Sequence, residues 1–254
     1  MPFTLAHPSA ILPLTRKWPT ALLPLTIGSM GPDIPYFLPT RIAEHLPNTH
    51  TLAGLLTVAT PLALLLYGLL LAARPAVIEP LWGSPRAALD RHLKNRPTSL
   101  RAALAVLIAT ATGCAIHVLW DSFTHGNGWM VQRLPALQHV VFQLAGMPLA
   151  VFRLLQYLSS VIGLAVLVCW ARRHLRLESM RHPTPPAWRP RVWLGLLLAT
   201  ALASAIAILS AAPRYANFHG RTYIALTTSL GTFVVLYLMV GAIAAWRIRI
   251  NLTD

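Results

Sequence analysis

Long apolar runs alternate with short basic loops along most of this chain. Five of these runs are each close to the roughly 20 residues that a helix needs to cross a bilayer. They cover residues 52–73, 100–120, 149–171, 192–212 and 224–246. The third is the least uniform, because Arg153, Gln156 and Tyr157 interrupt its first part. The pattern predicts an all-α, polytopic membrane protein with about five transmembrane helices.

A sixth apolar stretch, residues 21–30, is too short to span a bilayer alone. We expect it to form a re-entrant or interfacial segment, or a helix that flanking residues complete. Prolines divide the surrounding N-terminal region into short pieces. No polar stretch approaches the roughly 50 residues of a small soluble domain. Residues 1–254 are therefore expected to form a single integral membrane domain.

Composition and charge narrow the class of protein. The chain is 56% hydrophobic and 11% charged, whereas soluble domains average about 25% charged residues. A net charge of +14 would suggest nucleic-acid binding in a soluble protein, but here the basic residues lie in loops between apolar runs. We therefore expect membrane lipids as partners and no nucleic acid; the oligomeric state stays open.

The distribution of basic residues predicts the orientation. Fourteen of the 21 lysines and arginines lie in loops 74–101 and 172–191 or after residue 246. The positive-inside rule places these segments and the C-terminus in the cytoplasm. The first fifty residues, the 121–148 loop and the 213–223 loop then face outward. The N-terminus lacks the pattern of a cleaved signal peptide. The expected location is an inner (cell) membrane that the chain crosses several times.

The strongest chemical motif stands at the outer end of the second run. His117, Asp121 and His125 are four residues apart each, a spacing that places side chains on one helix face. His117 and Asp121 can reach one metal ion. A straight helix would carry His125 roughly 12 Å from His117 along its axis, but two glycines follow and favour helix termination. His125 could thus bend toward the same ion or a second one.

Further groups of metal-ligand type share the predicted outer face. They are His7, Asp33, His50, His139 and His219. Glycines and prolines around Asp33 predict a stiff turn, which could present a carboxylate for a metal or simply cap a turn. Single histidines such as His7 and His50 are more often core or surface residues. The hypothesis therefore depends on the whole set: His7, Asp33, His50, His117, Asp121 and His125 as ligands of one or two divalent ions, with zinc the leading choice.

Two weaker patterns lie nearby. Arg214, His219 and Arg221 could hold a phosphate of the substrate, although anchoring helix ends at the lipid headgroups is the simpler explanation. Arg153, Gln156, Tyr157 and Ser160 share one face of the third run. A polar stripe at that depth should face protein or water and could line the same cavity.

Four sequence motifs together resemble a family of uncharacterised bacterial integral-membrane proteins, a domain of unknown function. They are PFTLAHP (2–8), GSMGPDIPYF (28–37), HTLAGL (50–55) and HVLWDSFTH (117–125). The family is distantly similar to membrane-bound metal-dependent hydrolases and to zinc-dependent phospholipase C proteins. That similarity implies metal positions at His7, Asp33, His50, His117, Asp121 and His125. The chain departs from the soluble phospholipases in its membrane spans and lacks several of their ligands.

Three hypotheses follow. The first is a membrane-embedded metal-dependent hydrolase of lipid or phosphoester substrates, with Asp33 or Asp121 as the general base. The second is a transporter in which the same groups relay protons or bind a cation; the scarcity of charge along the membrane depth argues against it. The third is a non-catalytic protein in which the cluster only pins helices together.

Overall fold

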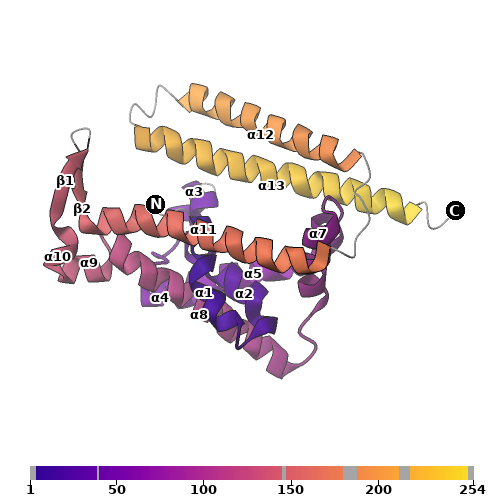
Figure 1. The fold of residues 1–254 in the computed structure, drawn as a ribbon, viewed down its shortest axis with the longest axis horizontal. Helices are drawn as coiled ribbons and strands as arrows, with labels where there is room; N and C mark the ends of the chain where they lie inside the picture. The colour runs from indigo at the N-terminus through magenta and orange to yellow at the C-terminus, as the bar shows by residue number, and fades with distance from the viewer. Residues whose placement is uncertain (1–3, 39, 145–146, 180–187, 212–217, 251–254) are drawn as a thin grey trace. The chain divides into compact units, whose positions relative to one another are not determined.

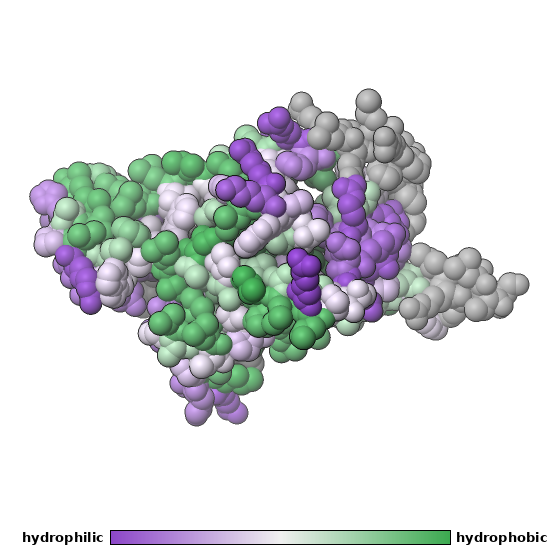
Figure 2. All heavy atoms as spheres, turned by 90° about the horizontal axis from the view of Figure 1, so that it is seen from below, coloured by the Kyte–Doolittle hydropathy of each residue, from purple (hydrophilic) through white to green (hydrophobic). Residues whose placement is uncertain are grey.

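Five helices are long and apolar enough to cross a membrane, as the sequence predicts. The computed structural model describes residues 4–38, 40–144, 147–179, 188–211 and 218–250 (Figure 1). The candidate spans are Leu52–Ala72, Leu100–Thr124, Val151–Leu175, Arg189–Ser210 and Thr227–Arg247. Exposed apolar side chains such as Leu104, Ile108 and Val161 cover them, and apolar surface occupies much of the face in Figure 2. In a membrane this surface contacts lipid.

The chain divides into two compact units. The first consists of Met1–Leu69 and Arg96–His174, and the second of Leu70–Asn95 and Leu175–Asp254. In the first unit, one span is built from α4 (Leu52–Gly54), a π-helical turn (Leu55–Ala59) and α5 (Thr60–Ala72), and the next is α8 (Leu100–Thr124). The helix α11 (Val151–Ser179) supplies the third span.

Short elements fill the N-terminal part of the first unit. They are the 3-10 turns Thr4–Ala6 and Pro19–Ala21, α1 (Pro8–Thr15), α2 (Leu22–Gly28), the 3-10 helix η3 (Gly31–Phe37) and α3 (Thr40–Ala43). The sixth apolar stretch is thus a short helix, Pro19–Gly28, that starts two residues before the predicted segment. Its placement in a bilayer stays a prediction.

The helix α2 packs closely on the middle of α8. A Cβ atom at Gly28 would lie 2.1 Å from the carbonyl oxygen of Thr110, and one at Gly113 would lie 2.4 Å from that of Leu25. Ile11, Leu25 and Ala109 form the buried core beside this contact. Since only glycine permits backbones to approach this far, the two glycines set the position of the residues that follow α2.

Replacing Gly113 by alanine is expected to destabilise the first unit by about 1–3 kcal/mol, the usual cost of overpacking. Gly68 in α5 is the matched control, because its Cβ atom would meet nothing within 4 Å. Gly68→Ala should be neutral or stabilising, since alanine favours a helix interior over glycine by about 1 kcal/mol. Thermal unfolding in detergent compares the two variants; equal stabilities would contradict the close packing of α2 on α8.

Each of the five candidate spans differs from its predicted apolar run by one to four residues at one or both ends. The helix α8 continues to Thr124, four residues past the end of the apolar run, and ends at His125, where the glycines that follow predict helix termination. The third span begins at Val151, not 149, because residues 149–150 belong to a strand. Between them lie α9 (Trp129–Arg133), α10 (Pro135–Gln138) and an unpredicted antiparallel hairpin of β1 (Val140–Leu144) and β2 (Met147–Ala150).

The second unit contains α6 (Arg74–Ile78), α7 (Gly83–Lys94), α12 (Trp188–Ala211) and α13 (Phe218–Ile250). The Tyr237 hydroxyl of α13 donates to the carbonyl of Val77, 2.6 Å away. The Trp193 indole of α12 donates to the carbonyl of Pro80 at 3.0 Å. These hydrogen bonds fix both long helices to the α6 region.

Asp90 of α7 forms ion pairs with Arg74 and Lys94. Partial burial raises the pKa of Asp90, but the hydrogen bonds and charges of Lys94 and Arg74 outweigh it, so the pKa lies below its usual range. The ionised Asp90 carboxylate therefore contributes fully to the free energy of unfolding above its unfolded-state pKa of about 3.9. This contribution disappears as the pH falls through the lower folded-state pKa. Asp90→Asn should flatten this acid dependence in thermal melts between pH 7 and pH 3. An unchanged acid profile would contradict the pairing.

Candidate metal centre

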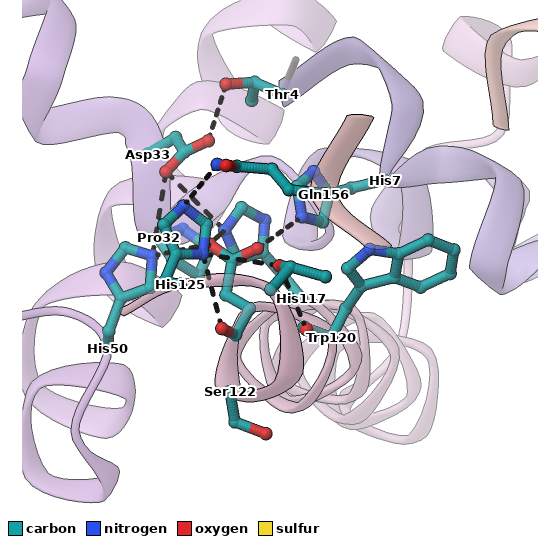
Figure 3. Close-up of polar contacts among 12 residues, drawn as sticks. Thr4, His7, Pro32, Asp33, His50, His117, Trp120, Ser122, His125 and Gln156 are labelled. Carbon is teal, nitrogen blue, oxygen red and sulfur yellow. Dashed lines mark hydrogen bonds and ion pairs between the residues drawn. The ribbon is translucent and has the colours of Figure 1, made fainter. Parts of the chain in front are cut away.

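The helix α8 carries the first two side chains of the site. His117 and Asp121 lie one turn apart on its buried face, as the four-residue spacing predicts. Figure 3 shows His117 close to His7, His50 and Asp33. The His117 Nδ1 atom is 2.7 Å from the carbonyl oxygen of Ser29, the residue that caps α2. A proton on Nδ1 is donated to this carbonyl, so Nε2 keeps its lone pair in the neutral ring. That Nε2 atom is 3.3 Å from Asp121 Oδ2.

Asp33 reaches the same point from η3. The short 3-10 helix follows α2 directly, and the close packing of α2 on α8 brings the Asp33 carboxylate to the His117 ring. Asp33 Oδ1 is 3.5 Å from His117 Nε2, and Oδ2 accepts a hydrogen bond from Thr4 Oγ1 at 2.5 Å. Burial raises the pKa of Asp33, but the hydrogen bond and charge of His117 and the hydrogen bond from Thr4 lower it further, below its usual range.

His50 enters from the turn before α4. Its Nε2 atom is 3.2 Å from Asp121 Oδ2 and 3.7 Å from Asp33 Oδ1. Its Nδ1 atom is 3.3 Å from the hydroxyl oxygen of Thr49, which itself donates to the carbonyl of Pro32 at 2.8 Å. The Thr49 hydroxyl proton is therefore in use, so the oxygen can accept from a protonated Nδ1. His50, like His117, then presents an unprotonated Nε2 to the carboxylates.

These four side chains form a group that could hold a divalent metal ion. One ligand atom from each of Asp33, His50, His117 and Asp121 lies within 4.8 Å of all the others. His117 Nε2 is buried and has no hydrogen-bond partner among the described residues. A metal-ligating histidine commonly uses the N–H of its other ring nitrogen to donate a hydrogen bond to a carbonyl or another oxygen. His117 can donate in this way to Ser29, and His50 to Thr49. Two imidazole nitrogens and two carboxylates suit zinc, manganese or iron.

His7 and His125 adjoin this group of four. His7 Nε2 is 3.0 Å from Asp121 Oδ1, and the His7 ring stacks on that of His117 with centroids 3.8 Å apart. His125 Nδ1 is 3.5 Å from Asp121 Oδ2. The chain turns out of the helix at His125, where φ is −116° and ψ is 139°. The six residues that the sequence proposes as ligands are thus gathered in one place.

The other sequence candidates have different outcomes. Gln156 of the polar stripe is buried, with its side-chain nitrogen 3.4 Å from His125 Nε2, whereas Tyr157 is exposed. Arg214 and the side chains of His219 and Arg221 lie outside the described residues. Sequence reasoning gave no role to Thr4 or Thr49. Only their positions in the sequence could have indicated them, since Thr4 precedes His7 by three residues and Thr49 immediately precedes His50.

A family model for a domain of unknown function, DUF4184, matches residues 1–247. The chain belongs to this DUF4184 family. No curated protein matches it, and no solved structure does. The match includes the six residues gathered here (the His/Asp cluster: His7, Asp33, His50, His117, Asp121 and His125) and their neighbours Thr4 and Gln156. The chemistry of this DUF4184 member therefore has to be inferred from the cluster itself.

Proposed function

We propose that the chain is a membrane-embedded, metal-dependent hydrolase of phosphoester substrates, including lipids. The observation that carries the proposal is the convergence of two carboxylates and two histidines whose Nε2 atoms face one point. A divalent ion bound there would lower the pKa of a coordinated water toward about 7 and polarise a phosphoryl oxygen. The location we propose is a bacterial inner membrane, with the site at the outer face and the C-terminus in the cytoplasm.

The contacts suggest different roles for the two carboxylates. Asp121 lies beside the rings of His7, His50 and His117 and is therefore the central ligand. Asp33 contacts two of these histidines at longer distances through Oδ1, and its Oδ2 accepts a hydrogen bond from the Thr4 hydroxyl. Asp33 is the better general base, because it can take a proton from an attacking water while Asp121 stays bound. His7, with its contact to the other Asp121 oxygen, holds that carboxylate in place.

The substrate would approach from the side of His50 and His125. Their side chains are 23% and 24% exposed, whereas the side chains of His7, His117, Asp33 and Asp121 are 6% exposed or less. The distant resemblance of the sequence motifs to membrane-bound metal-dependent hydrolases and zinc-dependent phospholipase C favours a phosphoester substrate. Arg214, His219 and Arg221 remain candidates for holding its phosphate.

Transport is the main competing function, and the charge distribution disfavours it. Asp121 is the one acidic residue within the five described spans. A cation or proton pathway commonly needs carboxylates along the membrane depth, and the one carboxylate of these described spans lies near the end of α8. Ion flux in proteoliposomes tests this alternative directly. A cluster that only pins helices together would show neither flux nor hydrolysis.

The proposed function predicts chelator-sensitive hydrolysis. Purified protein loaded with zinc, manganese or iron is assayed against bis(p-nitrophenyl) phosphate and against phosphatidylglycerol in mixed micelles. His50→Ala should lower the rate at least about 100-fold, because its ring is a proposed ligand at the substrate side. His174→Ala, a change of the same kind at an exposed position of α11, should keep the wild-type rate. Absence of hydrolysis with every metal would contradict the proposal.

A further inference from the structure

We propose that the groove between α8 and α11 binds the hydrocarbon chain of a lipid whose headgroup reaches the His/Asp cluster. The inference rests on the proposed function for its biological meaning, since it makes the substrate a membrane lipid instead of a soluble phosphoester. The groove itself is a separate structural feature, so its occupancy is measurable without turnover.

The groove is an open, largely apolar depression of about 400 Å³. Its walls include Ile116, Leu119, Trp120 and Phe123 of α8 and Leu155 and Ser159 of α11. The volume falls in the range of about 300–1,000 Å³ that is typical of ligand pockets. Three polar side chains line the groove, and each has a hydrogen-bond partner in the protein. The Trp120 indole donates to the Ser159 hydroxyl, the Ser159 hydroxyl donates to the carbonyl of Gln156, and the Thr124 hydroxyl donates to the carbonyl of Trp120, each at 3.3 Å. A bound group in the groove therefore meets hydrocarbon surface and needs no polar partner there.

One end of the groove adjoins the cluster. Trp120 lies beside His7 in Figure 3, with ring centroids 6.2 Å apart. Thr124, which also lines the groove, has its hydroxyl 3.4 Å from His125 Nδ1. Trp120 precedes Asp121 directly in α8, so one helix contributes the groove on one face and the metal site on the adjacent face. A molecule in the groove can thus place a polar end at the exposed side of the cluster.

The position of the groove in two spans indicates what occupies it. Both of its walls belong to helices long and apolar enough to cross a membrane, Leu100–Thr124 and Val151–Leu175. A groove that opens sideways from such helices faces lipid, where acyl chains are the surrounding medium. A chain from a neighbouring lipid can enter laterally, while its phosphate stays at headgroup depth beside His50 and His125. A soluble phosphoester would leave the groove unused.

The test compares two tryptophan substitutions one helical turn apart on α11. Leu155 lines the groove, and Leu158 is exposed on the same helix but outside the groove. Delipidated protein is titrated with palmitoyl-oleoyl phosphatidylglycerol and, separately, with dihexanoyl phosphatidylglycerol, and bound lipid is counted by native mass spectrometry in the presence of a chelator. Leu119→Trp fills the groove from the α8 wall and is the second variant. Size-exclusion profiles and melting temperatures select folded variants.

The groove predicts a difference that depends on chain length. Leu155→Trp and Leu119→Trp should weaken binding of the long-chain lipid at least about tenfold, the effect of overfilling a pocket. Leu158→Trp should bind it like the wild type, and the short-chain lipid should not distinguish the variants. Equal long-chain affinity in all folded variants would overturn the groove proposal, even if a soluble phosphoester is hydrolysed. If the wild type binds the long-chain lipid in the groove but hydrolyses no substrate, the result would contradict the proposed function and leave the groove proposal intact.

Discussion

Asp121→Asn is expected to abolish tight metal binding while leaving the protein folded. Asp121 contacts all four histidines of the cluster, and asparagine removes its negative charge without changing its size. Loss of an outer partner of a metal ligand typically lowers affinity 10–100-fold, an approximate range. Removal of the central ligand should lower the metal affinity by more than this. Competition with a fluorescent chelator measures the affinity of the wild type and the variant.

The matched control for this substitution is Asp90→Asn. Asp90 is also paired with cationic groups but lies in α7, which contributes nothing to the cluster. Its replacement should leave metal affinity unchanged at neutral pH. An Asp121→Asn protein that elutes as a folded species and still binds metal with wild-type affinity would exclude Asp121 as a ligand. Affinity lost equally in Asp90→Asn would show a general effect of destabilisation.

Removing the metal is expected to produce the largest change in stability. Without an ion, Asp33 and Asp121 face each other in a buried site with only histidines to balance them. A ligand at 1,000 times its Kd stabilises the folded state by about 4.1 kcal/mol. For a chain of this size each kcal/mol corresponds to roughly 2–4 °C in melting temperature. Chelation should therefore lower the melting temperature by about 8–16 °C.

Scanning fluorimetry in detergent with buffered free zinc or manganese measures this shift. The melting temperature should rise with the logarithm of the free metal concentration above Kd. The double variant Asp33→Asn, Asp121→Asn should show no such rise, because it lacks both carboxylates. A wild-type melting temperature independent of metal, or an equal rise in the double variant, would contradict a metal site at the cluster.

The sequence predicted the membrane-crossing helices because each depends on a local property, the length of an apolar run. It also predicted the shared face of His117 and Asp121 from helical spacing alone. It could not predict the hairpin at 140–150, since its apolar residues are equally compatible with the start of a span. Hydropathy alone ends the second apolar run at residue 120, but the two glycines after His125 correctly predict that α8 ends there.

The candidate site required information that no local pattern contains. The sequence proposes His7, Asp33 and His50 because they share the predicted outer face and lie in the family motifs. That they meet His117 depends on the packing of α2 against α8 through Gly28 and Gly113. The sequence did not predict that Thr4 would be the partner of Asp33 or Ser29 the partner of His117, because a hydroxyl or a backbone carbonyl has no distinctive sequence pattern. The groove beside the site arises from two helices distant in sequence, so neither helix alone indicates it.

Metal stoichiometry tests the central claim most directly. Protein purified in detergent without chelator is loaded with zinc, manganese or iron, freed of excess metal and analysed by inductively coupled plasma mass spectrometry, with wild type beside Asp121→Ala. The account predicts one or two bound ions per wild-type chain and close to none in the variant. Wild-type protein that retains none of the three metals, or Asp121→Ala protein that retains as much as the wild type, would contradict it.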